Sequence, residues 1–92
     1  MSIIVKRKGH KERFDEKKVY GSVYAACASM HYSERKCEKT ADEITRKIKN
    51  FVKNKKEIKS IDIRKKIESE LKNKNKELAF FYEQHLPNLK KL

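Results

Sequence analysis

Apolar and β-branched residues near the start of the chain predict two short strands. Ile3 to Arg7 is rich in β-branched residues and predicts a strand, and Lys11 to Phe14 predicts a returning, partly exposed strand. Gly9 stands between them and can adopt the positive φ that a tight turn needs. This part of the chain therefore predicts a β-hairpin.

Helical spacing of apolar residues follows the hairpin. Asp15 is placed to cap a first helix, whose apolar positions recur as far as Met30. Ser33 is placed to cap a second helix, and the Lys, Arg and Glu residues within it predict a solvated face. Its apolar stripe advances by alternating steps of three and four positions through Cys37, Ala41, Ile44, Ile48 and Phe51.

The remainder of the chain predicts two further helices. Glu57-Ile58-Lys59 is short enough for either a turn or a third small strand. Ser60 is placed to cap the third helix, and the fourth runs to Leu86, where Pro87 is expected to stop it. The pattern predicts an α+β fold, with one domain over residues 1–86 and a C-terminal tail over 87–92.

Composition agrees with a small folded domain. The chain has 92 residues and 11.0 kDa, enough for one domain. Charged residues make up 41% and hydrophobic residues 37%, but the regular apolar spacing and the presence of only two Gly and one Pro argue against disorder. No apolar run approaches the roughly 20 residues that span a bilayer, and the start is too short for a signal peptide. A cytoplasmic location without membrane contact is expected.

The charge balance indicates an anionic partner. Lys and Arg exceed Asp and Glu by 12, and such an excess attracts nucleic acid, nucleotide phosphates or an acidic protein surface. A general enrichment in lysine would explain the same number. The two explanations differ in whether basic residues lie where a specific site needs them.

Metal and catalytic sites find little support in the residue pattern. His10, His31 and His85 are far apart in sequence, and Cys27 and Cys37 have no metal-ligand spacing. Both cysteines are expected to pack as small apolar residues. Neither a Gly-x-Ser-x-Gly motif nor a phosphate loop is present in the sequence, so we expect no enzyme and no metal centre.

One group of charged residues could form a specific site near the hairpin. Cations beside carboxylates suit a phosphate chain plus a polar contact to a base. The group comprises Lys6, Arg7, Glu12, Asp15 and Lys18. Ser60 adds a hydroxyl at a helix start, where free N–H groups favour anions. Alternatively, Lys6 and Arg7 only protect an edge strand from aggregation and Ser60 is only a cap.

These residues resemble the ATP-cone domain, the regulatory nucleotide-binding module at the N-terminus of ribonucleotide reductases and in the repressor of their genes. The matching segments follow the family's order and spacing from Ile3 to about His85. They are Val5-Lys6-Arg7-x-Gly9, Glu12-x-Phe14-Asp15, Lys18-Val19, Tyr24-Ala25-Ala26, Ala41-Asp42-Glu43-Ile44-Thr45, Ile58-Lys59-Ser60-x-Asp62-Ile63-Arg64 and Leu78-Ala79-x-x-Tyr82. The hairpin motif together with the later Ser-x-Asp-Ile segment makes the resemblance specific.

The resemblance implies a fold and a ligand. The implied fold is a small antiparallel β-sheet, made of the hairpin plus a short third strand, that covers a four-helix bundle. ATP or dATP, with or without Mg²⁺, would bind between the two. Implied phosphate contacts are Lys6, Arg7, Lys18 and Ser60; implied adenine or sugar contacts are Glu12, Asp15 and Arg64; the implied pocket lining is Ile4, Phe14, Val19 and Ile63.

Three departures from the family pattern concern the same site. Lys8 replaces the acidic residue usual in the hairpin turn, and Ser60 stands where Thr is common. The family's late basic phosphate contact has no aligned counterpart, because Pro87 interrupts the alignment, and Lys90 and Lys91 are the candidates.

The resulting hypothesis is a free-standing ATP-cone that senses adenine nucleotides. It would signal allosterically to a ribonucleotide reductase or another regulated protein, or through self-association as a homo-oligomer. Nucleic-acid binding would be weak and non-specific. The alternative is a basic nucleic-acid-binding module or transcriptional regulator, and a third option is a helical scaffold that binds no nucleotide.

Overall fold

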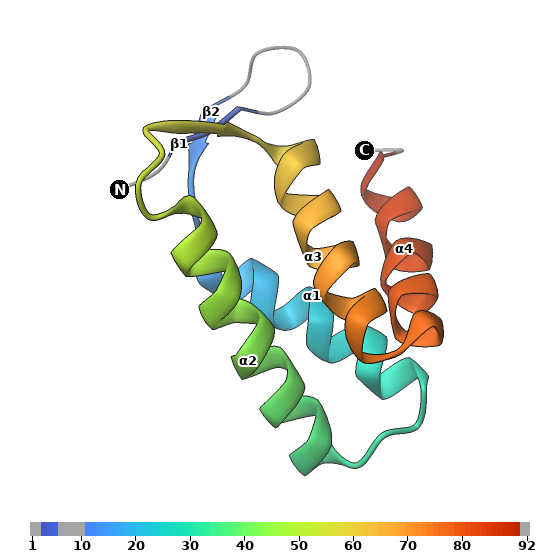
Figure 1. The fold of residues 1–92 in the computed structure, drawn as a ribbon. Coiled ribbons are helices and arrows are strands. Elements are labelled where there is room, and N and C mark those ends of the chain that lie inside the picture. The colour runs from blue at the N-terminus through green and yellow to red at the C-terminus, as the bar shows by residue number, and fades with distance from the viewer. Residues whose placement is uncertain (1–2, 6–10, 91–92) are drawn as a thin grey trace.

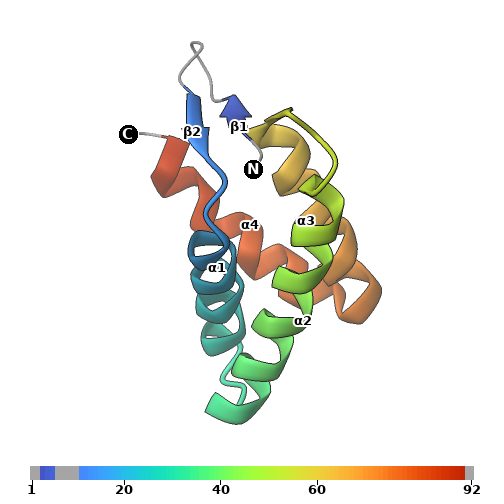
Figure 2. The ribbon, with the colours of Figure 1, turned by 90° about the vertical axis from the view of Figure 1, so that its left-hand side faces the viewer.

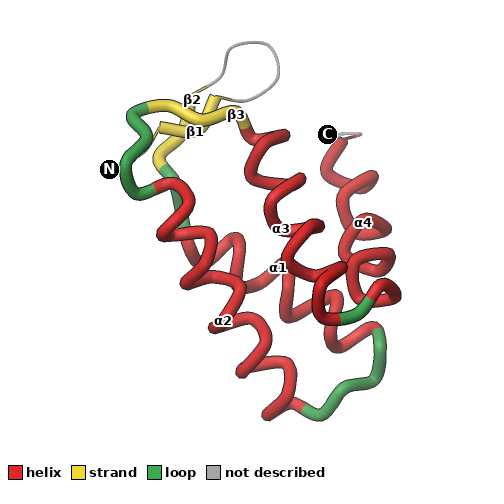
Figure 3. The backbone as a smooth tube through the Cα atoms, viewed as in Figure 1, coloured by secondary structure: helices red, strands yellow, loops and turns green. Residues whose placement is uncertain are grey.

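Four helices and three very short strands make up the part of the chain that can be described. A computed structural model describes residues 3–5 and 11–90, and within them the side chains of residues 11 and 13–84. The helices occupy most of the molecule and the strands gather at one end (Figures 1 and 3). In chain order the elements are β1 (Ile3–Val5), β2 (Lys11–Arg13), α1 (Glu16–Ser29), α2 (Glu34–Val52), β3 (Glu57–Lys59), α3 (Ser60–Lys74) and α4 (Lys76–Lys90).

The sheet is mixed, with the strand order β2-β1-β3. β1 runs antiparallel to β2, pairing Ile3 with Arg13, and parallel to β3, pairing Ile3 with Glu57. The expected fold, an antiparallel sheet that covers a four-helix bundle, is therefore wrong. Three-residue strands extend only about 10 Å, whereas helices of 14 to 19 residues extend about 20 to 30 Å, so the sheet sits at the end of the helices.

The direction of β3 follows from the path of the chain. α1 leads away from the sheet and α2 returns to it (Figure 2), so the chain re-enters the sheet after a helical crossover rather than a tight turn. A crossover of this length is the connection that allows parallel pairing. The antiparallel expectation failed because the direction of Glu57–Lys59 depends on helices far from it in sequence.

Two of the three predicted N-caps are confirmed. The Asp15 carboxylate accepts a hydrogen bond from the Lys17 N–H at 2.9 Å, and the Ser33 hydroxyl accepts one from the Lys36 N–H at 3.2 Å. The predicted cap at Ser60 is wrong, because Ser60 is the first helical residue of α3 and Lys59 occupies the N-cap position. Pairing with Val5 holds Lys59 in an extended conformation. Lys59 is therefore the N-cap, and α3 begins one position earlier than predicted, at Ser60.

The predicted end of the fourth helix at Pro87 is also wrong. α4 continues through Pro87 to Lys90. Proline lacks an N–H and crowds the preceding turn, but at this position the disturbance falls in the last turn of the helix. The continuation brings the end of α4 to the same end of the molecule as the sheet (Figures 1 and 2).

The core lies mainly between α1 and α2 and is closed by α3 and α4. The predicted stripe on α2 is confirmed for Cys37, Ala41, Ile44 and Ile48, whereas Phe51 is half-buried and Val52 takes the inward position. Cys27 packs beside Cys37, and burial raises the pKa of the Cys27 thiol to about 11, so this cysteine is an apolar core residue, as expected. Across residues 3–5 and 11–90, no helix is both long and apolar enough to cross a membrane.

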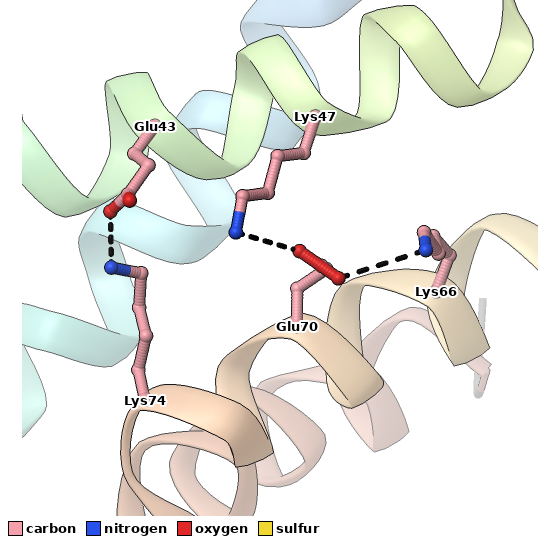
Figure 4. Close-up of polar contacts among 5 residues, drawn as sticks. All are labelled: Glu43, Lys47, Lys66, Glu70 and Lys74. Atoms are coloured by element: carbon pink, nitrogen blue, oxygen red, sulfur yellow. Dashed lines mark ion pairs between the residues drawn. The ribbon is translucent and has the colours of Figure 1, made fainter.

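Charged side chains join α2 to α3 (Figure 4). Glu70 lies between two cations, with Lys47 Nζ at 3.0 Å and Lys66 Nζ at 3.6 Å, and Glu43 pairs with Lys74 further along. The hydrogen bond from Lys47 holds the pKa of the Glu70 carboxyl below its usual value, and that from Lys74 does the same for Glu43. We call these five residues the α2–α3 seam.

Candidate functional site

The start of α1 carries three residues of the predicted nucleotide site. Asp15 caps the helix and is exposed, Lys18 is exposed one turn later, and Val19 turns into the core with 6% of its surface accessible. One carboxylate oxygen of Asp15 accepts from the Lys17 N–H. A carboxylate offers several acceptor positions, so the cap leaves acceptor capacity on Asp15 for a ligand donor.

The start of α3 carries three more residues of the predicted nucleotide site. Ser60 is partly buried as the first helical residue, Arg64 is partly buried one turn later, and Ile63 is 8% exposed. Arg64 is close enough to Tyr82 for its positive charge to act against the burial that raises the pKa of Tyr82 to about 12. Ser60 and Arg64 therefore sit on the side of α3 that faces toward α4.

The strands connect these two helix starts. Ile4 pairs with Glu12 on one side and with Ile58 on the other, so β1 separates the strand that leads to α1 from the strand that leads to α3. The backbones of Ile4 and Glu12 are described but their side chains are not. Lys6 and Arg7, the first two predicted phosphate contacts, lie outside the described residues, as does Lys91.

Three of the predicted lining residues belong to one hydrophobic cluster. Val19 and Ile63 are buried in it, and Phe14 packs against it while half-buried. With less than a tenth of their surface accessible, Val19 and Ile63 can offer a base only an edge, whereas Phe14 offers more. The starts of α1 and α3 therefore both contribute residues to the same hydrophobic core.

A second feature was missed by sequence reasoning. A hollow of about 630 Å³ opens between the end of α2, β3 and the outer side of α3, and no predicted site residue whose side chain is described lines it. The available signal in the sequence is the run Lys53-Asn54-Lys55-Lys56 before β3, together with Lys65 and Lys66 after it. Among the described side chains, no group of three His, Cys, Asp or Glu residues is arranged to hold a metal ion.

An exposed capping carboxylate and Lys18 lie at the start of α1, and Ser60 and Arg64 lie at the start of α3, where free N–H groups favour an anionic ligand. The family model of the ATP cone domain matches residues 2–84, so the chain belongs to the ATP-cone family, and the predicted resemblance is confirmed. A curated relative, the transcriptional repressor NrdR of Carboxydothermus hydrogenoformans, is 36% identical over 70 residues. That alignment covers 76% of this chain and 44% of the repressor, so the chain spans less than half the length of that relative.

These findings establish the general class of the protein. It is an ATP-cone domain, a nucleotide-binding regulatory module. The family membership also agrees with a regulatory rather than a catalytic role.

Proposed function

We propose that the chain binds ATP or dATP at the sheet end of its helices and conveys the bound state to another protein or to a second copy of itself. The observation that carries the proposal is the ATP-cone match over residues 2–84, which includes both helix starts and the whole sheet. The module would regulate and would not catalyse a reaction.

The phosphates would be held by cations and a helix start. Lys6, Arg7 and Lys18 would supply ammonium and guanidinium donors, and Ser60 would supply a hydroxyl where α3 presents its first N–H groups. A nucleotide that binds as its magnesium complex would bring Mg²⁺ to the same phosphates. α4 ends at Lys90, at the same end of the molecule as the sheet (Figure 1), and this supports a phosphate site there.

The base and sugar would be held by the two carboxylates and Arg64. Glu12 and Asp15 would accept hydrogen bonds from the adenine edge, and Arg64 would lie near the sugar. Phe14 is half-buried at the end of β2 and would provide the apolar surface against the base, with Ile4, Val19 and Ile63 contributing edges.

The partner would be a ribonucleotide reductase, another regulated protein or a second ATP-cone. A ligand can shift a conformational equilibrium only by its difference in affinity for the two states, so signalling requires that ATP and dATP, or the bound and empty forms, stabilise different surfaces. Size-exclusion chromatography with light scattering in ATP, in dATP and without nucleotide would detect self-association directly.

Thermal unfolding with a panel of nucleotides tests ligand binding. At about 100 times its Kd a ligand adds about 2.7 kcal/mol to stability, which raises the Tm by roughly 10 to 20 °C in a domain of this size. We expect such a rise with ATP or dATP and a much smaller one with GTP and CTP. Equal rises with all nucleotides would remove base recognition from the proposal, and no rise with any would remove nucleotide binding.

Charge reversal tests the position of the site. Lys6→Glu and Lys18→Glu should each weaken ATP at least tenfold, because each removes a charged donor and opposes the phosphates with a carboxylate. Lys39→Glu is the matched control, since Lys39 is exposed on α2 and the charge change is equal. Equal weakening in all three variants would mean that the net charge alone attracts the nucleotide.

A nucleic-acid-binding module remains the second candidate, favoured by the net charge of +12. The relative is a transcriptional repressor, which agrees with it. Binding to many backbone phosphates weakens steeply with salt. We expect duplex binding that is independent of sequence and lost by about 150 mM salt, where the Debye length is about 8 Å. A sequence-specific footprint that survives this salt concentration would favour the second candidate.

A further inference from the structure

The hollow of about 630 Å³ lies on the opposite side of α3 from the proposed nucleotide site. Residues along an α-helix are rotated by about 100° each, so Asp62 and Lys66 point roughly away from Ser60 and Arg64. The volume falls in the range of small-ligand sites. Its apolar floor is formed by Phe51, which is half-buried, and Ile58, which is buried.

Four lysines surround this floor, and two of them converge on one ring. Lys55 Nζ lies 4.3 Å and Lys66 Nζ 5.6 Å from the centre of the Phe51 ring. Lys55 Nζ also donates to the Phe51 carbonyl oxygen at 2.9 Å, which fixes its position at the end of α2. Lys59 and Lys65 are exposed at the rim, from β3 and α3.

Two carboxylates, Glu57 and Asp62, line the hollow beside its four lysines. Glu70 is shared, because it is 3.6 Å from Lys66 but 3.0 Å from Lys47 (Figure 4). Glu57 lines the hollow but pairs with Lys11 Nζ at 3.0 Å. Asp62 is the remaining carboxylate at the rim. Like charges gathered in this way repel one another, and an anion between them would remove that repulsion.

We propose that this hollow binds a chain of phosphate groups, with Lys55, Lys59, Lys65 and Lys66 as its cationic contacts. Ammonium groups from the loop after α2, from β3 and from α3 can follow successive phosphates, and the apolar floor leaves room beside them for a sugar or base. The tail of a free nucleoside polyphosphate and the backbone of a nucleic-acid strand present the same chemistry. This site is separate from the proposed nucleotide site, so an experiment that contradicts one of the two proposals leaves the other standing.

Titration of the full chain with sodium tripolyphosphate, followed by amide NMR spectra, tests the location. The measurement is made without nucleotide, because the phosphates of added ATP would compete with tripolyphosphate for the hollow. We expect saturable shifts at the amides of residues 55–59, 62, 65 and 66. Shifts confined to residues 15–19, 60, 61, 63 and 64, or no saturable shifts, would overturn the proposal.

Paired variants test the contacts. Lys59→Ala with Lys65→Ala should weaken tripolyphosphate at least tenfold, because two charged donors are lost, whereas Lys39→Ala with Lys76→Ala changes the net charge equally and should have little effect. Asp62→Asn should tighten binding several-fold, since it removes the opposing carboxylate. Equal weakening in the two double variants would overturn the proposal.

A short oligothymidylate distinguishes the two sources. If the hollow takes a nucleic-acid backbone, the oligonucleotide should bind more tightly than tripolyphosphate and lose affinity in the Lys59/Lys65 variant. If it takes a free polyphosphate, tripolyphosphate should bind more tightly and lose affinity in the same variant. Loss of affinity for neither probe would show that the hollow is not an anion site.

Discussion

Asn75 donates a hydrogen bond from Nδ2 to the hydroxyl oxygen of Tyr32 at 3.1 Å, across 43 positions of sequence. The same residue connects two helices, because its N–H donates to the Leu71 carbonyl at the end of α3 and its Oδ1 accepts from the Glu77 N–H at the start of α4, both at 2.8 Å. One side chain therefore joins the α3–α4 turn to the α1–α2 turn.

Replacement of Asn75 by Ala should destabilise the protein by about 1 to 3 kcal/mol, because a helix cap and a hydrogen bond are both lost. For a domain of this size, each kcal/mol lowers the Tm by about 4 to 8 °C. Tyr32→Phe is the control, because it removes the hydrogen bond and keeps the ring that lies 4.0 Å from Lys36 Nζ. Urea unfolding measures both, and equal losses would mean that the cap adds nothing.

Thr45 should be replaceable by Val with a gain in stability. Among the described residues its Oγ1 is the buried side-chain oxygen that has no hydrogen-bond partner, and burial of an unpaired hydroxyl costs about 1 to 3 kcal/mol. Val has nearly the same shape and a similar helix propensity. Thr40→Val is the contrasting variant, because Thr40 is also buried but its hydroxyl contacts Cys27. A loss of stability in Thr45→Val, measured by urea unfolding, would contradict this account.

Acid should weaken the α2–α3 seam. The pKa of Glu70 is lowered in the folded protein, mainly by its hydrogen bond from Lys47, and that of Glu43 by its hydrogen bond from Lys74. A carboxyl with a lowered folded pKa stabilises the fold above its unfolded pKa of about 4.3, and the stabilisation is lost as the pH falls through the folded pKa. The free energy of unfolding should therefore decrease as the pH is lowered below about 4.

Glu70→Gln should reduce stability at neutral pH and make the acid dependence shallower. Glu83→Gln, which removes an exposed carboxylate from α4, serves as the control. The measurement is urea unfolding from neutral pH down to about pH 3. An unchanged slope in Glu70→Gln would show that the pair with Lys47 does not contribute to the pH dependence.

Local rules predicted the parts of the fold that depend on neighbouring residues. Asp15 and Ser33 cap their helices through contacts within three positions, and the residue type alone indicates this. Ser60 has the same residue type but lost the cap position because Lys59 pairs with Val5. Distant pairing of this kind has no signature in the local sequence.

The candidate site shows the same difference between contacts of neighbouring residues and contacts of residues far apart in the sequence. Asp15 and Lys18 were predicted as ligand contacts because they lie in one contiguous motif that resembles the family, and the structure places both at the start of α1. The hollow beside α3 was missed because Phe51 and Lys66 meet only after α2 and α3 are packed together. Neither periodicity nor composition predicts such a contact between two helices.

The short connection between α1 and α2 has a consequence for the order of folding. These two helices share the most extensive packing and are joined by only a few residues, so they can associate at a low cost in loop-closure entropy. The pairing of Ile3 with Glu57 closes a much longer loop, which costs more entropy. We therefore expect the sheet to form after α1 and α2 have associated. Where association of the helices is the rate-limiting step, a ligand held at the sheet contacts structure that forms after it. Such a ligand would prolong the lifetime of the folded state by slowing unfolding and would leave the folding rate nearly unchanged.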